Sequence, residues 1–520
     1  MPPGSRTVDY RKTVAATAGA ALLAAVAAGV FDLPGIITAF TPARVVYGAA
    51  LFISDQLRWG AGAAAACLAL VAVGAFRRWW RERLADALAT ITPGRWLAAL
   101  AAVALALRLA YAFTAAPPFV SDEACYDRVT RSLLAGGGYA EAGVPTAYWP
   151  VGYPLFIAPL YLLGHFHPFV VILAQAVLGA GTAVLVTALA EAAAFDRAAA
   201  RAAGLTVALL PSQIGYASRF FPQVLCAFLV VLAAFVVIRY GRWWAGGVAG
   251  AILGYATLVV PVAAALWGAI IISDVFCGRP WRRVITRALC AAAVAAAIVT
   301  PWAIRNYRVL GAFVPFATNG GINLWMGNNA RASGAYRFPL TMENPVYIAG
   351  GEVAQDRTGR RLALHYMVEE RDRALLLMVP KFLYLYGSDV SAFQYEGEAR
   401  GVSPLAAARA WKARLAQIMY AAFVVAAVIG LGRRKGFFRR GPAGVAPCAV
   451  FVWPALLTVA YLLFFGGERF HFPMVPLLAV FAGAALMPLR GRDAAKPGRE
   501  GVPVGEGDGR TTVLKGLEDA

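Results

Sequence analysis

Two adjacent acids, Asp122 and Glu123, are the residues of this sequence best suited to chemistry. They follow an apolar segment, and a carboxylate at the boundary of water and membrane can accept a proton from an incoming hydroxyl group. The alternative is structural, because Ser121 followed by two acids is also a common start of a helix. The choice between these interpretations depends on the elements that position the pair.

Those elements are predicted to lie in a membrane. The chain has 520 residues, of which 60% are hydrophobic and 15% are charged, whereas a soluble domain carries about 25% charged residues. Many apolar runs approach the roughly 20 residues of a membrane-spanning helix. The composition therefore predicts an all-α polytopic membrane protein.

The net charge of +20 comes largely from arginines that cluster between the apolar runs. Such clusters mark the cytoplasmic loops of a membrane protein and contact anionic headgroups. We therefore predict membrane lipids, and no nucleic acid, as partners of this basic chain.

About twelve apolar segments are predicted to span the membrane. They fall at about 13–32, 57–76, 96–115, 168–190, 201–216, 219–238, 245–258, 260–275, 286–301, 412–431, 446–465 and 472–488. Basic clusters in alternate connections place both chain ends in the cytoplasm. The stretch 153–164 is too short to cross and is predicted as a re-entrant or interfacial helix. Residues 357–386 are predicted as one amphipathic surface helix.

This topology divides the chain into consecutive parts. Residues 1–95 form an N-terminal two-helix membrane extension with a cytoplasmic loop, and 96–301 form a transmembrane module whose first outer loop is 116–152. Residues 302–411 are a long outer-face (periplasmic) loop region, and 412–489 are the C-terminal transmembrane helices. The tail 490–520 is rich in glycine and charge, which predicts disorder in the cytoplasm.

Metal and disulfide chemistry is not expected. The six cysteines have no paired spacing, and His165 and His167 stand two residues apart without a nearby carboxylate. We predict neither a metal site nor a cofactor. Arg108 lies inside a predicted span, where charge is costly, so we expect it to pair with Asp122 or Glu123 or to extend to the headgroups.

Several motifs together resemble the GT-C glycosyltransferases, in particular the bacterial branch of aminoarabinose transferases and protein O-mannosyltransferase-like enzymes. The motifs are DEACY at 122–126, GGGY at 136–139, YWPVGYPLF at 148–156, PWAIRNY at 301–307, TNGGINLWMGNN at 318–329 and, weakly, ERF at 468–470. Their order, spacing and common membrane face carry the resemblance, which covers roughly 96–490.

The resemblance implies a GT-C-type bundle of about 12 transmembrane helices with two outer-face loops that bear short interfacial helices. It implies a multi-pass enzyme of the cell inner (plasma) membrane, with its active site on the periplasmic side. Such an enzyme transfers a hexosyl or pentosyl unit from a polyprenyl-phosphate sugar, which is a substrate rather than a cofactor, to a hydroxyl of a glycan, lipid or protein. Inversion at the anomeric carbon is expected, and we expect a monomer.

The resemblance also assigns roles to residues. Asp122 matches the base that deprotonates the acceptor, and Glu123 matches the acid that orients it. Arg305, Arg469 and Lys381 are the candidate ligands of the donor phosphate, although each could instead extend to headgroups. The candidate substrate-binding residues are Tyr126, Tyr139, Trp149, Tyr153, Asn319, Asn323, Trp325 and Asn328. The aromatic residues could equally be membrane anchors, and the asparagine stretch a tight outer turn.

Two positions depart from the resembled pattern. The aminoarabinose branch carries a lysine before the proline pair of the first loop, whereas Tyr148-Trp149-Pro150 of this sequence has none. Relatives often have a glutamate where this sequence has Gln223, which cannot act as a base. A phosphate ligand must therefore come from elsewhere, and Gln223 weakens any two-carboxylate mechanism that relies on that position.

Two other functions remain open. A transporter or lipid flippase predicts paired halves and charges at the membrane midplane, whereas the acids here lie in outer loops. A polysaccharide polymerase or ligase is a neighbouring enzyme class with a similar layout.

Overall fold

The computed structural model describes residues 83, 85–114, 121–336, 344–394, 405–433 and 445–487. The predicted spans at 13–32 and 57–76, the start of the first outer loop and the predicted tail 490–520 lie outside these residues. The predicted total of twelve spans is therefore not confirmed.

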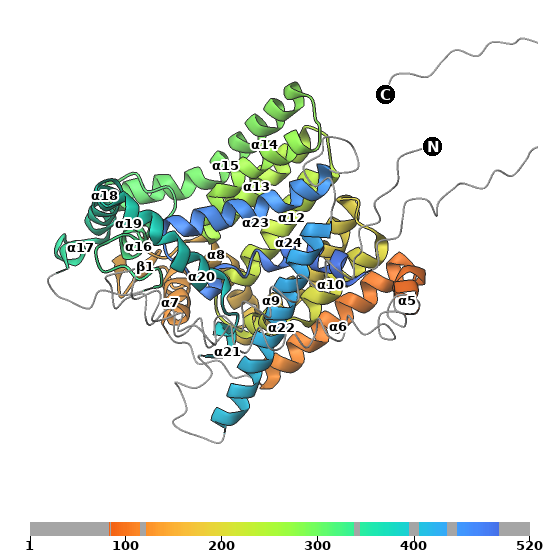
Figure 1. Cartoon of the computed structure of the whole chain (residues 1–520). Helices are drawn as coiled ribbons and strands as arrows, with labels where there is room; N and C mark the ends of the chain where they lie inside the picture. Colours follow the sequence, from red (N-terminus) through yellow and green to blue (C-terminus); the bar gives the residue numbers. More distant parts are fainter. Residues whose placement is uncertain are drawn as a thin grey trace, which may run out of the picture. The chain divides into compact units, whose positions relative to one another are not determined.

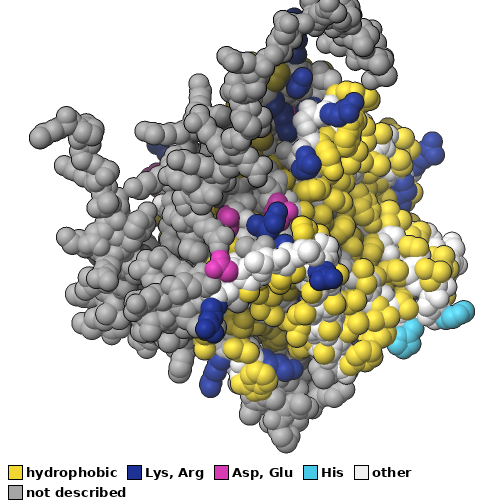
Figure 2. Space-filling model, turned by 90° about the vertical axis from the view of Figure 1, so that its right-hand side faces the viewer, with side chains coloured by type: hydrophobic (Ala, Val, Ile, Leu, Met, Phe, Trp, Pro, Cys, Tyr) yellow, Lys and Arg dark blue, Asp and Glu magenta, His cyan; other side chains and the backbone are white. Residues whose placement is uncertain are grey.

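Four described helices are long and apolar enough to cross a membrane, judged by length and composition. They are α6 (Pro93–Thr114), α9 (Phe169–Ala192), α15 (Trp281–Leu310) and α22 (Leu405–Arg433). Shorter apolar helices accompany them: α8 (Gly152–Leu163), α12 (Gln223–Arg239), α13 (Trp244–Val259), η3 (Pro261–Leu266) with α14 (Trp267–Phe276), α23 (Val445–Leu463) and α24 (Val475–Leu486). Apolar side chains cover much of the described surface on one face, as lipid contact requires (Figure 2).

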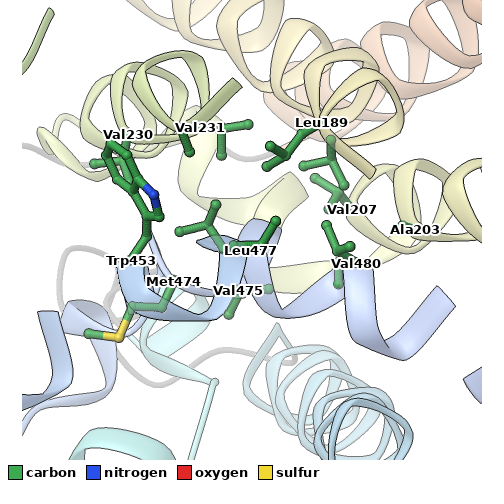
Figure 3. Close-up of a cluster of buried hydrophobic side chains, with 14 of the residues drawn as sticks. Leu189, Ala203, Val207, Val230, Val231, Trp453, Met474, Val475, Leu477 and Val480 are labelled. Carbon is green, nitrogen blue, oxygen red and sulfur yellow. The ribbon is translucent and has the colours of Figure 1, made fainter. Parts of the chain in front are cut away.

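The core lies where α9, α10 (Arg197–Leu209), α12, α23 and α24 meet. Helix α24 is apolar on all sides, which is the pattern of a helix surrounded by protein. Its Leu477 and Val480 are fully buried, and Trp453 of α23 packs into the same cluster (Figure 3).

The predicted span 201–216 is broken, which corrects the sequence analysis. It consists of the end of α10, the short helix α11 (Pro211–Gly215) and η2 (Tyr216–Ser218). Pro211 has no N–H group to donate to the carbonyl of Val207 four residues earlier, so a continuous helix would leave that carbonyl without a partner.

Arg108 supplies the missing donor. Its Nη2 lies 3.2 Å from the oxygen of Val207, and its Nη1 lies 2.9 Å from the oxygen of Ala104. The guanidinium is fully buried against Gly179. The expected pairing of Arg108 with Asp122 or Glu123 is therefore wrong, because its guanidinium donates to backbone oxygens of α6 and α10 instead.

Short elements of the two outer-loop regions gather at one side of the bundle (Figure 1). They are α7 (Asp122–Leu134), α16 (Gly320–Gly327), α17 (Pro345–Ile348), α18 (Glu352–Glu369), α19 (Arg371–Leu376), α20 (Met378–Tyr386) and α21 (Ser391–Gln394). The single helix predicted at 357–386 is thus three helices, because the chain leaves the helical conformation at Glu370. The remaining short elements are α5 (Ala85–Thr90) and η4 (Glu468–Phe470).

The first outer loop also contains a small hairpin, which the all-α prediction missed. Strands β1 (Ala140–Glu141) and β2 (Val144–Pro145) are antiparallel, with Ala140 opposite Pro145. The two turn residues, Ala142 and Gly143, both have positive φ, as a type I′ hairpin turn requires.

Candidate active site

A cavity of about 460 Å³ lies between the outer-loop elements and the ends of the short apolar helices. Its walls come from α7, the segment before α8, the start of α12, η3, α16, α23 and η4. The charged and amide side chains that line it are Asp122, Gln223, Asn319, Asn323, Arg360 and Arg469. Predicted site residues from distant parts of the sequence, such as Asp122 and Arg469, therefore share one cavity.

Asp122 is the first residue of α7, and its carboxylate is paired with Arg469. The Nη1 of Arg469 donates to Oδ2 of Asp122 at 2.8 Å, and the two side chains are 34% and 26% exposed. Burial alone lowers the pKa of Arg469, but the carboxylate of Asp122 outweighs it and raises that pKa above the ordinary value. Both side chains line the cavity and remain partly exposed.

Ser121 directly precedes α7, where the sequence allowed a capping role. Ser121 has a φ of 52° and its side chain accepts no hydrogen bond from the first turn of α7. Its hydroxyl donates to Oδ1 of Asp122 at 3.3 Å instead. Ser121 is thus not a helix cap, and it orients the carboxylate of Asp122.

Glu123 faces the protein interior rather than the cavity and is fully buried. Its Oε2 accepts a hydrogen bond from Arg219 at 2.8 Å, and its Oε1 accepts one from the backbone N–H of Phe220 at 2.9 Å. Glu123 is not part of the cavity wall. In this position it holds α7 against the segment before α12 and so fixes the direction of Asp122.

Arg469 is the only one of the three predicted phosphate ligands that lines the cavity within the described residues. Its guanidinium lies over the rings of Phe221 and Phe470, at 5.4 and 5.3 Å from their centres. The neighbouring Glu468 accepts hydrogen bonds from the backbone N–H groups of Val390 and Ser391. Burial raises the pKa of Glu468.

His471 holds the other side of the same turn. It is fully buried, and its Nε2 lies 3.1 Å from Oδ1 of Asp389. Its Nδ1 lies 2.5 Å from the carbonyl oxygen of Leu385. Arg469 is therefore presented from a turn that is anchored at both ends.

Arg305 and Lys381 have other partners. Arg305 donates to the backbone oxygens of Thr146 and Tyr139 at 2.8 and 2.7 Å, which ties the hairpin to α15. Lys381 is 1% exposed and donates to Oδ1 of Asn328 at 2.8 Å. Burial lowers the pKa of Lys381 to about 8. Neither side chain belongs to the cavity wall.

Some of the predicted substrate-binding residues line the cavity, and the others lie outside it. Tyr126, Trp149, Asn319 and Asn323 line the cavity. Outside it lie Tyr139, Tyr153, Trp325 and Asn328.

Of the predicted substrate-binding residues outside the cavity, three form hydrogen bonds that stabilise the structure around it. The hydroxyl of Tyr139 donates to the oxygen of Trp149 at 2.8 Å, and that of Tyr153 donates to Gln175 at 3.1 Å. Asn328 donates to the backbone oxygens of Leu324 and Leu463. These side chains position the wall residues.

Sequence reasoning missed Arg360, Tyr148 and Tyr336 as lining residues. Arg360 donates to Asp356 at 2.7 Å, and Asp356 accepts the N–H of Gly321 at 2.6 Å. A Cβ atom on Gly321 would lie 1.9 Å from the backbone oxygen of Asp356, so only glycine permits this approach of α16 to α18. The spacing of Asp356 and Arg360, four residues apart, was the available signal.

Comparisons with known proteins give structural similarity only. No family's sequence model matches the chain, and no curated protein matches it. In the crystal structure of the Archaeoglobus fulgidus oligosaccharyltransferase with Zn and sulfate, 75% of this chain aligns at 14% identity with a TM-score of 0.46. The structure of the same enzyme tethered to an acceptor peptide with the NVT sequon aligns with 78% of this chain. The chain spans about half the length of that enzyme, 48% and 50% in the two structures.

A second similar structure is ArnT from Cupriavidus metallidurans bound to undecaprenyl phosphate. It aligns with 76% of this chain and 78% of its own, at 16% identity and a TM-score of 0.36. All three TM-scores lie below 0.5.

Proposed function

We propose that this protein is an integral membrane glycosyltransferase that transfers a monosaccharide from a polyprenyl-phosphate donor to an acceptor hydroxyl. The observation that carries the proposal is the ion pair of Asp122 and Arg469 in a cavity bounded on one side by outer-loop helices and on the other by apolar helices. A lipid-linked sugar needs both kinds of wall, because its sugar phosphate is polar and its chain is apolar.

The apolar wall suits the chain of the donor. Pro261 and Val262 of η3, together with Phe464 and Phe465 after α23, line that side of the cavity. These residues belong to or follow two of the shorter apolar helices, Pro261–Phe276 and Cys448–Leu463. The donor phosphate would then lie beside Arg469, at the boundary of the two walls.

In the proposed mechanism the ion pair of Arg469 with Asp122 is replaced by an ion pair of Arg469 with the donor phosphate. The carboxylate of Asp122 is then left without its ion-pair partner. Asp122 then accepts the proton of the acceptor hydroxyl while that oxygen forms a bond to the anomeric carbon. The bond from the anomeric carbon to the phosphate oxygen breaks, and the phosphate leaves with the electron pair, stabilised by Arg469. Attack opposite the leaving group inverts the anomeric centre.

The site needs no general acid, because polyprenyl phosphate leaves as a stable anion. We further propose that the reaction takes place at the outer (periplasmic) face of the inner membrane. The acceptor belongs to a glycan, a lipid or a protein, and the enzyme acts as a monomer.

The test uses purified full-length protein in lipid nanodiscs and a panel of radiolabelled polyprenyl-phosphate sugars. Wild type should transfer the sugar of at least one donor, and Asp122→Asn should lower kcat by about a hundredfold or more, since general bases contribute that much. Asp127→Asn on the same helix is the matched control, because Asp127 pairs with Arg131 and does not line the cavity. Movement of the carrier across the bilayer without consumption of the donor would indicate the flippase instead.

A further inference from the structure

A second cavity, of about 510 Å³, lies where the connection between α12 and α13 meets the first turns of α15. It is lined by Gly241, Arg242, Trp243, Arg282, Arg283, Thr286 and Arg287, none of which lines the candidate active site. Its chemistry is therefore independent of the proposed glycosyl transfer.

Two parallel helices begin beside this cavity. A Cβ atom added to Gly246 would lie 2.4 Å from the backbone oxygen of Arg287, and one added to Gly250 would lie 2.3 Å from that of Ala291. Gly254 approaches Ala295 in the same way. The residue numbers of the contacting positions increase together along both helices, so α13 and α15 run parallel. Their N-termini, which are the positive ends of the helix dipoles, therefore lie at one end.

Three arginines add to this positive field. Arg242, Arg282 and Arg283 are exposed, and Arg282 and Arg283 stand in the first turn of α15, where the helix dipole disfavours cations. In the part of the chain that the structure describes, none of the three forms a salt bridge. Asp274, the nearby acid, is already paired with Arg279 and Arg287.

The wall of the cavity is held by a buried charge. Arg287 is fully buried, and its Nη1 donates to the backbone oxygens of Tyr240 and Arg242 at 2.6 and 2.8 Å. Its Nε donates to Asp274 at 2.7 Å. The backbone that presents Arg242 is therefore fixed before any ligand binds.

The flanking tryptophans indicate the depth of the cavity. Trp243 and Trp281 are 65% and 67% exposed beside it. Exposed tryptophans at the ends of membrane helices lie at the level of the headgroups. An anion that reaches this cavity is thus at headgroup depth, on the side that the arginine clusters predict to be cytoplasmic.

We propose that this cavity binds the phosphate of an anionic phospholipid headgroup. A phosphate ester is the group that the cavity would bind, because arginine side chains and helix N-termini both bind phosphate. The headgroup depth and the exposed tryptophans favour a bilayer lipid over a soluble phosphate as its source. Basic cavities between membrane helices on the cytoplasmic side bind lipids of this kind.

The test titrates full-length protein in detergent with phosphatidylglycerol or phosphatidylcholine in mixed micelles and counts bound lipid by native mass spectrometry. Phosphatidylglycerol should bind wild type about a hundredfold more tightly than phosphatidylcholine, because three arginines contribute to its binding. The triple variant R242Q/R282Q/R283Q should lose that preference. The matched control R357Q/R361Q/R371Q removes three exposed arginines of α18 and α19 and should keep it.

Thr286→Glu provides a second variant, because it places an acid in the cavity while leaving all arginines in place. It too should weaken phosphatidylglycerol binding about tenfold. Equal binding of the two lipids to wild type, or equal loss in the triple and control variants, would overturn the proposal. Displacement of phosphatidylglycerol by an equal concentration of inorganic phosphate would overturn the assignment to a lipid.

Discussion

At the scale of single residues, the helix period separates two neighbouring acids. Side chains of consecutive helical residues point about 100° apart. Asp122 therefore faces the cavity and Arg469, while Glu123 faces the protein interior and Arg219. The sequence identified both acids, but only the position of α7 against its neighbours decides which one faces a substrate.

Glu123→Gln should destabilise the fold, whereas Asp122→Asn should not. Removing the charge of Glu123 leaves Arg219 without its buried counter-ion, and breaking a buried pair costs about 3–5 kcal/mol. Asp122 and its partner Arg469 are about one-third exposed, so its replacement costs at most about 1 kcal/mol. Thermal unfolding of both variants measures the difference, and equal melting temperatures would contradict these assigned environments.

The buried Lys381 should make the protein more stable at high pH. Its pKa is about 8 in the folded protein and about 10.4 in an unfolded chain. Above the unfolded value the lysine is neutral in both states, and as the pH falls through 8 the folded state must bury its charge. The free energy of unfolding should therefore rise between pH 8 and 10.4, by about 3 kcal/mol from this group.

The measurement compares melting temperatures of wild type and Lys381→Met across this range. The difference between the two proteins should shift in favour of wild type as the pH rises. A difference that stays constant with pH would show that Lys381 is not buried as a lysine of lowered pKa.

At the scale of elements, the length of an apolar run predicted several helices correctly, whereas the break within the predicted span 201–216 was not predicted. The predicted spans 96–115, 168–190 and 286–301 correspond to α6, α9 and α15, because a bilayer demands long apolar helices. The span 201–216 failed at Pro211, whose missing N–H was visible in the sequence. The role of Arg108 in satisfying Val207 was not predictable, since the two residues are 99 positions apart.

The parallel contact of α13 with α15 depends on its glycines. Gly250→Ala should destabilise the protein by about 1–3 kcal/mol, because the new methyl group would meet the backbone of Ala291. Gly268→Ala on α14 is the matched control, since its methyl group would meet no atom within 4 Å. That control should be neutral or stabilising by up to about 1 kcal/mol. Unfolding in a denaturing detergent would test this, and equal stabilities would refute the close helix contact.

At the scale of the whole molecule, the candidate site is assembled from distant segments. Asp122 and Arg469 are 347 positions apart, and η4 presents the arginine only because Glu468 and His471 are anchored to residues near 390. The sequence predicted both partners and their common face of the membrane. It could not predict that they pair, nor that Arg305 and Lys381 are committed to Thr146 and Asn328. Those choices depend on tertiary contacts that no local pattern records.

The most direct test of the central claim separates donor binding from transfer at this ion pair. Single-turnover reactions and equilibrium donor binding would be measured for wild type, Asp122→Asn and Arg469→Gln with the donor that wild type uses. Asp122→Asn should bind the donor at least as tightly as wild type and transfer its sugar about a hundredfold or more slowly. Arg469→Gln should lose affinity for the donor as well, since it lacks the phosphate ligand. Transfer by Asp122→Asn at the wild-type rate, or undiminished donor binding by Arg469→Gln, would contradict the account.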